Sequence, residues 1–403
     1  MQTRFDAIIA GAGPAGSTAA ILLARAGWSV ALIEKQEFPR RKVCGECIAA
    51  SNLGLLDALG VGDEFSATAG PELRRVALMQ GTCTLSGELP AFDHPRHAWG
   101  RALGRETLDT LLLTRARAAG AVVLQPWSVQ SLDGPPGAFR CAVRAAGSRH
   151  DTQVLHAPVA IAAHGSWEPL PANRAPRRGR RRPSDLFGFK ANFREAMLSI
   201  GLLPVLSFEG GYGGMVCADG GVTTLACCVR ADRLDELRCA APGICAGEVV
   251  EAMLRRECAG VDAALRNAHR LDAWLASGPI QPGIHMQPDD AILRVGNAAG
   301  EAHPIIGEGL SMAMQSAWLL CAHLLRAAPR LDAARLRTVR DRYAAEWRRH
   351  FTPRLRLAGA IAHLAMRPHL LAPLLPLLNY RSTLLGHVAR WGGKVRCVAE
   401  ENL

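Results

Sequence analysis

Two cysteines and a carboxylate stand close together in the segment KVCGEC, residues 42–47. Cys44 and Cys47 have the C-x-x-C spacing of a metal-ligand pair or of a redox dithiol. A zinc site needs about four ligands, and the sequence offers no second C-x-x-C or histidine pair at a suitable spacing. We therefore expect no metal site here. A dithiol stays open, because a helical pattern begins near Ile48 and its N-terminus would favour a Cys47 thiolate.

The residues before this segment predict a strand at 5–10, a helix at 15–26 and a second strand at 30–33. Glycines with G-x-G-x-x-G spacing lie between the first strand and the helix, where a dinucleotide pyrophosphate meets the helix N-terminus. An acid ends the second strand, where it can accept hydrogen bonds from both ribose hydroxyls. The residues expected to bind a dinucleotide are Gly11, Gly13, Pro14, Ala15, Gly16, Glu34 and Lys35.

A second glycine-rich segment, GNAAGEAHPIIGEGL, begins at residue 296 and leads into a long amphipathic helix that starts near Gly309. It resembles the ribityl-binding motif of the flavin-dependent oxidoreductase superfamily that includes p-hydroxybenzoate hydroxylase, geranylgeranyl reductases and flavin-dependent halogenases. The resemblance implies FAD as the cofactor. Amides at this helix N-terminus can stabilise negative charge on a reduced flavin. The resemblance assigns cofactor or catalytic roles to Gly296, Asn297, Pro304, Gly307, Gly309 and Leu310, with Asn297 at a usual Asp position.

Two further segments resemble this superfamily. GRETLDTLLL implies that Arg105 heads a helix and contacts FAD, and FPRRKVCG is closest to the geranylgeranyl-reductase-like branch. This likeness implies that the KVCGEC loop flanks the flavin. Arg41 or Lys42 would face phosphate or ribose, Gly45 would allow close approach, and Cys44 or Glu46 would line the reacting edge. The expected catalytic residues are Cys44, Glu46, Pro304 and Gly307.

Two segments depart from the superfamily pattern. AAHG at residues 162–165 stands where relatives have an acid, a small residue and glycine, so part of the pattern linked to NAD(P)H recognition is absent. We still expect NAD(P)H as the electron donor. His164 is either a proton donor or a turn residue. The W-x-W-x-I-P motif of halogenases is missing, which disfavours halogenation.

The resemblance implies an α/β fold with a Rossmann-like FAD-binding domain, an interleaved antiparallel-sheet substrate domain and a C-terminal helical region. We assign 1–70, 96–165 and 272–345 to the first, 71–95 and 166–271 to the second, and 346–403 to the third. Small and sulfur-bearing residues near Tyr212 fit either a roomy apolar pocket or the packing of a sheet on a helix; they are Gly213, Gly214, Met215, Cys217 and Cys227.

Composition narrows the class of protein. The chain of 403 residues is 49% hydrophobic and 21% charged, which predicts a folded globular protein. Its net charge of +11 suits an acidic partner, but no nucleic-acid-binding motif accompanies it. We expect no nucleic acid partner. The arginine-rich segment 174–182 is either a solvated loop or a docking site for an acidic carrier protein.

The sequence has no signal-peptide pattern and no long uninterrupted apolar run, so we expect a cytoplasmic protein. Leucines at helical spacing follow residue 354, interrupted by Pro368, Pro373 and Pro376 and bordered by arginines. These short helices either cap the protein's own core, close over an apolar substrate, or rest on the inner face of the membrane as a peripheral contact.

These features together predict an FAD-dependent oxidoreductase of secondary metabolism. The leading hypothesis is a monooxygenase that hydroxylates a small lipophilic or aromatic substrate, such as an aromatic, a polyketide or a lipid-tailed phenol, free or bound to a carrier protein, through a flavin C4a-hydroperoxide. The alternative is a reductase that saturates carbon–carbon double bonds of a lipid. An FAD-binding redox sensor and a halogenase are the remaining hypotheses.

Overall fold

The computed structural model describes residues 2–148, 151–166, 181–329, 331–380, 385–386 and 389–390. Most of the arginine-rich segment 174–182 and the last part of the C-terminal region lie outside these residues. Within the described part of the chain, no helix is both long and apolar enough to cross a membrane.

The first layer is built on a five-stranded parallel sheet in the order β19-β11-β1-β2-β7. Its strands are β1 (Ala7–Ala10), β2 (Val30–Ile33), β7 (Val122–Leu124), β11 (Val159–Ala162) and β19 (Leu293–Arg294). Both faces of the central strands are buried, which is why they are continuous apolar runs. The predicted Rossmann-like fold is confirmed.

Each face of the parallel sheet has its own cover. Helices α1 (Pro14–Arg25), α4 (Arg105–Ala118) and α8 (Gly309–Ala327) pack with Ile9, Leu32 and Ile161. The alternate residues Ile8 and Ile33 pack against a three-stranded sheet of β8 (Trp127–Asp133), β9 (Phe139–Ala145) and β10 (Thr152–Ala157). The period of two along each strand therefore divides the core between the helices and the small sheet.

The second layer is an eight-stranded sheet, here called the large sheet. Its order is β16-β12-β15-β14-β13-β4-β5, with β17 also paired to β12. Neighbours are antiparallel except β4 and β13, which run parallel. The strands are β4 (Arg75–Gln80), β5 (Cys83–Glu88), β12 (Leu186–Arg194), β13 (Leu202–Phe208), β14 (Gly211–Cys217), β15 (Thr223–Arg230), β16 (His269–Arg270) and β17 (Leu275–Ser277).

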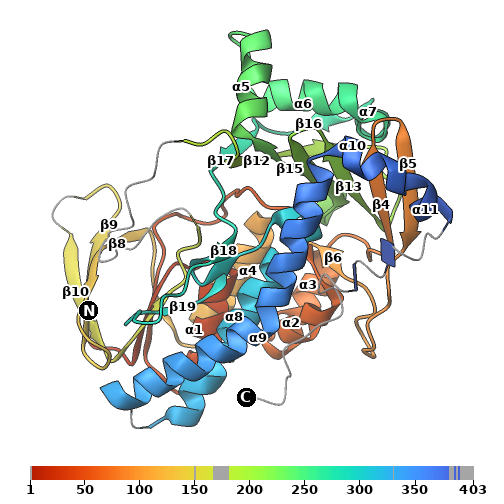
Figure 1. The fold of residues 1–403 in the computed structure, drawn as a ribbon. Coiled ribbons are helices and arrows are strands. Elements are labelled where there is room, and N and C mark those ends of the chain that lie inside the picture. Colours follow the sequence, from red (N-terminus) through yellow and green to blue (C-terminus); the bar gives the residue numbers. More distant parts are fainter. Residues whose placement is uncertain are drawn as a thin grey trace.

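One face of the large sheet carries the helices α5 (Ala231–Ala240), α6 (Ala246–Glu257) and α7 (Ala259–Leu265) (Figure 1). Strand β17 belongs to this sheet, although residue 272 was predicted to begin the last part of the FAD-binding domain. The large sheet therefore extends to Ser277, six residues beyond the predicted end at residue 271.

Short elements connect the layers. Strand β3 (Cys47–Ile48) pairs with β6 (Arg101–Ala102), and β18 (Gly283–Ile284) pairs with β20 (Gly300–Glu301). The small helices between the layers and near the C-terminus are α2 (Leu53–Ala58), α3 (Gly62–Thr68), α10 (Pro368–Leu371) and α11 (Leu375–Tyr380). The 3₁₀ turns are η1 (Ala50–Asn52), η2 (Asp219–Gly221), η3 (Gly296–Ala298), η4 (Pro304–Ile306) and η5 (Ala372–Leu374).

Helix α9 (Ala333–Ala365) is one long helix that runs from the end of α8 up to the large sheet (Figure 1). The predicted boundary between residues 345 and 346 falls inside this helix. The two halves of the helix pack on different layers. Trp347 and Phe351 pack in the core of the first layer, whereas Ala362 and Ala365 pack beside Tyr212 of the large sheet.

Candidate active site

A cavity of about 550 Å³ lies between the parallel sheet and the large sheet. Every site residue predicted from the sequence lines it except Gly16. Gly16 has a packing role instead, since a Cβ there would come within 1.8 Å of the Gly11 carbonyl oxygen. Gly11 itself has φ +106° and leaves no room for a side chain against Ala163. The glycines therefore allow the tight turn and the close contact of α1 with β1.

The turn after β1 opens onto a group of cationic side chains. A Cβ on Gly13 would lie 3.8 Å from Arg105 Nη2 and 3.9 Å from Arg40 Nη2, so the backbone here faces open space between two guanidinium groups. Lys42 joins this group: burial, together with Arg105 and Arg40, lowers the pKa of its ammonium to about 8. Positive charge beside a helix N-terminus suits a pyrophosphate. The sequence predicted roles for Lys42 and Arg105; Arg40 belongs to the FPRRKVCG segment, but no role was assigned to it.

Arg41, the other cation predicted near phosphate or ribose, has different partners. Its Nη2 donates to the Ala273 carbonyl oxygen at 3.2 Å, and its Nη1 lies 3.5 Å from Asp272 Oδ2. Of the two alternatives, Lys42 is therefore the one that lies with the Arg40 and Arg105 guanidinium groups.

Glu34 lies at the end of β2, where the sequence placed a ribose-binding acid. Its carboxylate accepts hydrogen bonds from the backbone N–H groups of Ala12 and Gln36, each at 3.0 Å. The Arg40 Nη2 atom lies 3.7 Å from Glu34 Oε2. The buried carboxylate is thus held at the mouth of the glycine turn, beside the space where a dinucleotide ribose would lie.

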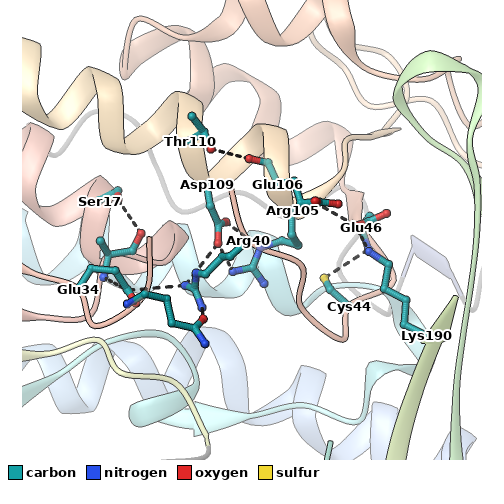
Figure 2. Close-up of polar contacts among 12 residues, drawn as sticks. Ser17, Glu34, Arg40, Cys44, Glu46, Arg105, Glu106, Asp109, Thr110 and Lys190 are labelled. Atoms are coloured by element: carbon teal, nitrogen blue, oxygen red, sulfur yellow. Dashed lines mark hydrogen bonds and ion pairs between the residues drawn. The ribbon is translucent and has the colours of Figure 1, made fainter. Parts of the chain in front are cut away.

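Arg105 begins α4, as predicted. Its guanidinium makes two hydrogen bonds of 2.7 Å to the Asp109 carboxylate, one turn along the same helix. Asp109 is fully buried and also lies 3.5 Å from Arg40 Nη2. Burial alone would lower the pKa of Arg105, but the Asp109 carboxylate outweighs it and the pKa is raised. Figure 2 shows the resulting row of alternating charges from Glu34 through Arg40 and Asp109 to Arg105.

Glu46 continues this row toward the large sheet (Figure 2). Its carboxylate is paired with the Lys190 ammonium of β12, accepts a hydrogen bond from the Thr224 hydroxyl of β15 at 2.5 Å, and accepts one from the Arg105 backbone N–H at 3.0 Å. Glu46 was predicted as a catalytic residue, but these donors hold its carboxylate in place. Lys190 was not predicted, and its only signal is a lysine inside an apolar strand, LFGFKANF.

The two cysteines of the KVCGEC loop lie in different surroundings, with Cys44 partly buried and Cys47 buried. Cys44 is half-buried at the cavity wall, where the Glu46 N–H lies 3.3 Å from its sulfur. Cys47 is in β3 and packs with Leu73 and Val216. A helical segment begins close to the predicted position, since β3 ends at Ile48, η1 covers Ala50–Asn52 and α2 follows at Leu53. The redox dithiol stays a prediction.

Asn297 lies in a compact polar cluster on the other side of the cavity. Its side-chain N–H₂ donates to Ser166 Oγ at 2.9 Å and to Glu301 Oε1 at 3.2 Å. Burial raises the pKa of the Glu301 carboxyl group. Glu301 was not predicted, yet it supplies a carboxyl group next to the position where Asn297 replaces the usual acid.

The segment 304–310 forms η4 and then the start of α8 at Gly309. Gly307 has φ +62°, which ends the 3₁₀ turn in a left-handed conformation. No atom lies within 4 Å of a Cβ built on Gly309, so the N-terminus of α8 is open. A flavin ring fits this arrangement, because Gly307 and Gly309 line the cavity at the start of α8. His164, the residue considered as a proton donor, also lines the cavity, in the segment after β11.

The large sheet forms the opposite wall. Gly188, Gly214 and Ala226 line the cavity and are small, which leaves room above the expected flavin edge. The sulfur-bearing residues Met215 and Cys227 also line the cavity, and both belong to the hydrophobic cluster beneath α5–α7. Both interpretations of this segment were therefore partly right.

A tyrosine and a histidine meet at one side of this wall. Tyr212 Oη lies 3.0 Å from His303 Nδ1, and the two rings are in edge contact. Burial and the neighbouring His363 lower the pKa of His303 to about 4, so its imidazole is neutral near pH 7. Burial raises the pKa of Tyr212 well above its usual value. The Tyr212 hydroxyl therefore keeps its proton and can donate to His303.

Comparisons with known proteins agree with this site. Conditioned medium factor receptor 1 from Dictyostelium discoideum is 27% identical over 81% of the chain, and the match covers 64% of that relative's length. Digeranylgeranylglycerophospholipid reductase from Methanocaldococcus jannaschii is 26% identical over 77% of the chain and 74% of its own. The chain thus spans less than two thirds of the first of these relatives.

Two solved structures share the fold. A geranylgeranyl bacteriochlorophyll reductase-like protein from Thermoplasma acidophilum has a TM-score of 0.73 at 16% identity, over 97% of this chain and 96% of that one. PqsL from Pseudomonas aeruginosa, described as a probable FAD-dependent monooxygenase, has a TM-score of 0.70 at 19% identity, over 93% of this chain and 100% of that one.

A family model described as "FAD binding domain" matches residues 4–355. That range contains the glycine turn, the charged row from Glu34 to Glu46 and the N-terminus of α8. Because the match spans most of the chain, the protein belongs to the FAD binding domain family.

Proposed function

We propose that the protein is a monooxygenase that hydroxylates a large apolar substrate carrying a phenolic hydroxyl. The observation that carries this proposal is the wall of the cavity formed by the large sheet. Small and apolar residues leave room for an apolar body, and the Tyr212–His303 pair offers a partner for one hydroxyl group. A buried polar pair of this kind discriminates between substrates with and without a matching hydroxyl.

Different residues would bind the cofactor and the substrate, at the two ends of the cavity. Lys42, Arg40 and Arg105 would hold the pyrophosphate of FAD, and Glu34 would accept hydrogen bonds from its ribose. When bound, FAD would accept electrons from a reductant and activate dioxygen. The N-terminus of α8 would stabilise negative charge at the ring. NAD(P)H as that reductant is part of the proposal.

The Tyr212–His303 pair would handle the substrate proton. A phenolic O–H of the substrate donates to Tyr212 Oη while the tyrosine donates its own proton to the neutral His303 Nδ1. This hydrogen bond from the phenol leaves more electron density on the substrate ring without a proton transfer, because the low pKa of His303 makes its imidazole a weak base. An electron-rich ring is the one that accepts an electrophilic oxygen atom.

Reduction of a carbon–carbon double bond is the second candidate. The likeness to the digeranylgeranylglycerophospholipid reductase favours it, since that match extends over 77% of the chain. Saturation adds a hydride to one carbon and a proton to the other. Tyr212 is suited to donate that proton, because burial keeps its hydroxyl protonated.

Turnover with and without oxygen tests both candidates. The FAD-loaded protein is supplied with NADPH, NADH or dithionite, and with either a long-chain alkylphenol or geranylgeraniol. Under isotope-labelled dioxygen we expect the alkylphenol to gain one labelled oxygen atom, detected by mass spectrometry, and no product to form anaerobically. The matched Tyr212→Phe variant should keep its FAD and lose most of this product.

Other outcomes would reject the monooxygenase. Saturation of geranylgeraniol without oxygen would establish the reductase and reject the monooxygenase. Reducible FAD with no product from either probe would reject both and favour a redox sensor.

Contact with a membrane surface stays a prediction, supported by the exposed side chains of Leu370 and Tyr380.

A further inference from the structure

We propose that Lys190 is a positioning residue that sets the place of Cys44 at the cavity wall, acting through Glu46. Lys190 belongs to the large sheet, whereas Glu46 and Cys44 belong to the loop after β2. The proposal rests on the proposed function only in that this loop is expected to flank the flavin. Figure 2 shows the three side chains at the end of the charged row.

The first step is the burial of the pair. The Lys190 side chain is 1% exposed and the Glu46 side chain 2% exposed, and their charged atoms are in contact. An ammonium so deeply buried needs an opposite charge and further hydrogen bonds. Thr224 supplies one of these bonds to Glu46, and its hydroxyl also lies 3.0 Å from Asn192 Oδ1. Side chains from β12 and from β15 of the large sheet therefore both contact the Glu46 carboxylate.

The second step is the backbone of Glu46. Its φ is +59°, a left-handed conformation that residues other than glycine rarely adopt. Such a conformation persists when surrounding contacts hold it. The side-chain contacts from Lys190, Thr224 and the Arg105 N–H do so here. Without Lys190, the Glu46 carboxylate loses its counter-charge. One of the contacts that hold the Glu46 backbone in this conformation is then absent.

The third step connects Glu46 to the thiol. The Glu46 N–H lies 3.3 Å from Cys44 Sγ, and the Arg105 guanidinium also contacts the Cys44 side chain. Arg105 is fixed by its two bonds to Asp109. The N–H of Glu46 turns with its backbone, so a change at Lys190 moves one of the two donors that face the sulfur. Cys44 should then shift or become more mobile.

Alkylation of Cys44 in the full-length, FAD-loaded protein tests the proposal. The rate of its reaction with iodoacetamide is measured by peptide mass spectrometry in the wild type and in Lys190→Met. The exposed thiols Cys239 and Cys245 act as internal references. We expect Cys44 to react about tenfold faster in Lys190→Met, as loss of roughly one charge-assisted hydrogen bond implies, with the reference thiols unchanged.

Three further variants keep the test decisive. Thr224→Val should accelerate Cys44 less than Lys190→Met does. The double variant Lys190→Met/Glu46→Gln leaves no unpaired buried charge, so it remains usable if Lys190→Met fails to fold, and it should show the same acceleration. Arg266→Met removes a positive charge from an exposed side chain of 69% exposure and should change nothing.

An unchanged Cys44 rate in variants that keep their melting temperature and FAD content would reject the proposal. It would also be rejected if all thiols accelerated together, because that indicates general loosening, or if Cys44 reacted in no variant. The measurement needs no substrate. A failure here is therefore separate from a failure of the proposed monooxygenase activity.

Discussion

At the scale of single residues, Lys42 is a side chain whose charge should change with pH in the mildly alkaline range. It lies with Arg40 and Arg105 beside the glycine turn, and burial with these neighbours lowers its pKa to about 8. A bound phosphate would favour the protonated amine, because an opposite charge stabilises the charged form. Binding of FAD should therefore raise the pKa of Lys42 and take up a proton at mildly alkaline pH.

FAD affinity should consequently fall as pH rises through about 8. Below this pH the free protein already carries the proton that the complex requires. Above it, binding must also capture a proton, so affinity drops by up to about tenfold per pH unit. Lys42→Met should weaken binding about fivefold to tenfold at neutral pH, as loss of one charge-assisted contact implies, and should flatten the pH dependence.

Quenching of flavin fluorescence by the apo-protein, followed from about pH 6 to about pH 9 around the expected pKa, measures both effects. Lys35→Met, at another lysine that lines the same cavity, is the matched comparison and should retain the pH dependence. An identical pH profile in the wild type and in Lys42→Met would contradict the assignment.

Local spacing was enough to predict some of these residues but not others. Gly13, Glu34 and Arg105 follow from motifs in which the distance along the chain fixes the place in a βαβ unit or a helix start. Lys190 and Glu301 do not, because each acts on a partner brought close only by the fold. Lys190 is 144 positions from Glu46, and no pattern within β12 marks a lysine that pairs across two layers.

At the scale of secondary structure, the large sheet presents different residues to its two sides. Among the residues that line the cavity on β14 and β15 are Gly214 and Ala226, which are register partners. Met215 and Leu225, also partners, pack under the helices. The glycine-rich sequence of β14 was compatible with either a pocket or a packed sheet, because its assignment depends on which side of the strand each residue faces.

Ala226→Phe should narrow the cavity and exclude long substrates while leaving FAD in place. A bulky ring would project from β15 into the space above the flavin edge. We expect KM for the long-chain alkylphenol to rise at least about tenfold, with a smaller rise for a short-chain alkylphenol and with unchanged FAD content in absorbance spectra. Met215→Leu conserves volume on the other side of the sheet and should alter neither quantity.

Equal rises in KM for the short and long alkylphenols would show that Ala226 does not limit substrate length. Loss of FAD from Ala226→Phe would place the residue against the cofactor rather than the substrate.

At the scale of the whole molecule, α9 ties the two layers together. Its middle packs with the parallel sheet's helices and its end packs against the large sheet. Arg354 on this helix is 1% exposed and donates to Gln315 Oε1 of α8 at 3.0 Å. The superfamily resemblance placed the limit of the FAD-binding domain at residue 345, so the sequence predicted a separate helical region after it. No glycine between residues 333 and 358 marks an end of the helix.

Deletion of residues 352–403 should therefore yield an insoluble protein without FAD. The deletion removes Arg354 and the alanines that cover Tyr212, so Gln315 loses a buried partner and an apolar wall is exposed. Solubility and flavin absorbance after expression measure the outcome. Deletion of residues 391–403 alone is the comparison and should retain bound FAD. A soluble, yellow protein lacking 352–403 would show that this half of α9 is dispensable.

The order in which the chain is made sets when the cofactor can enter. Helix α1 buries its apolar face against α8, yet α8 begins only at Gly309. At about 5–20 residues per second, a ribosome needs roughly 15 to 60 s to travel between these helices. During that interval the nascent α1 lacks its partner and is a target for chaperones. The cavity takes residues from Gly11 to Ala313, so FAD can be captured only by a chain whose synthesis is nearly complete.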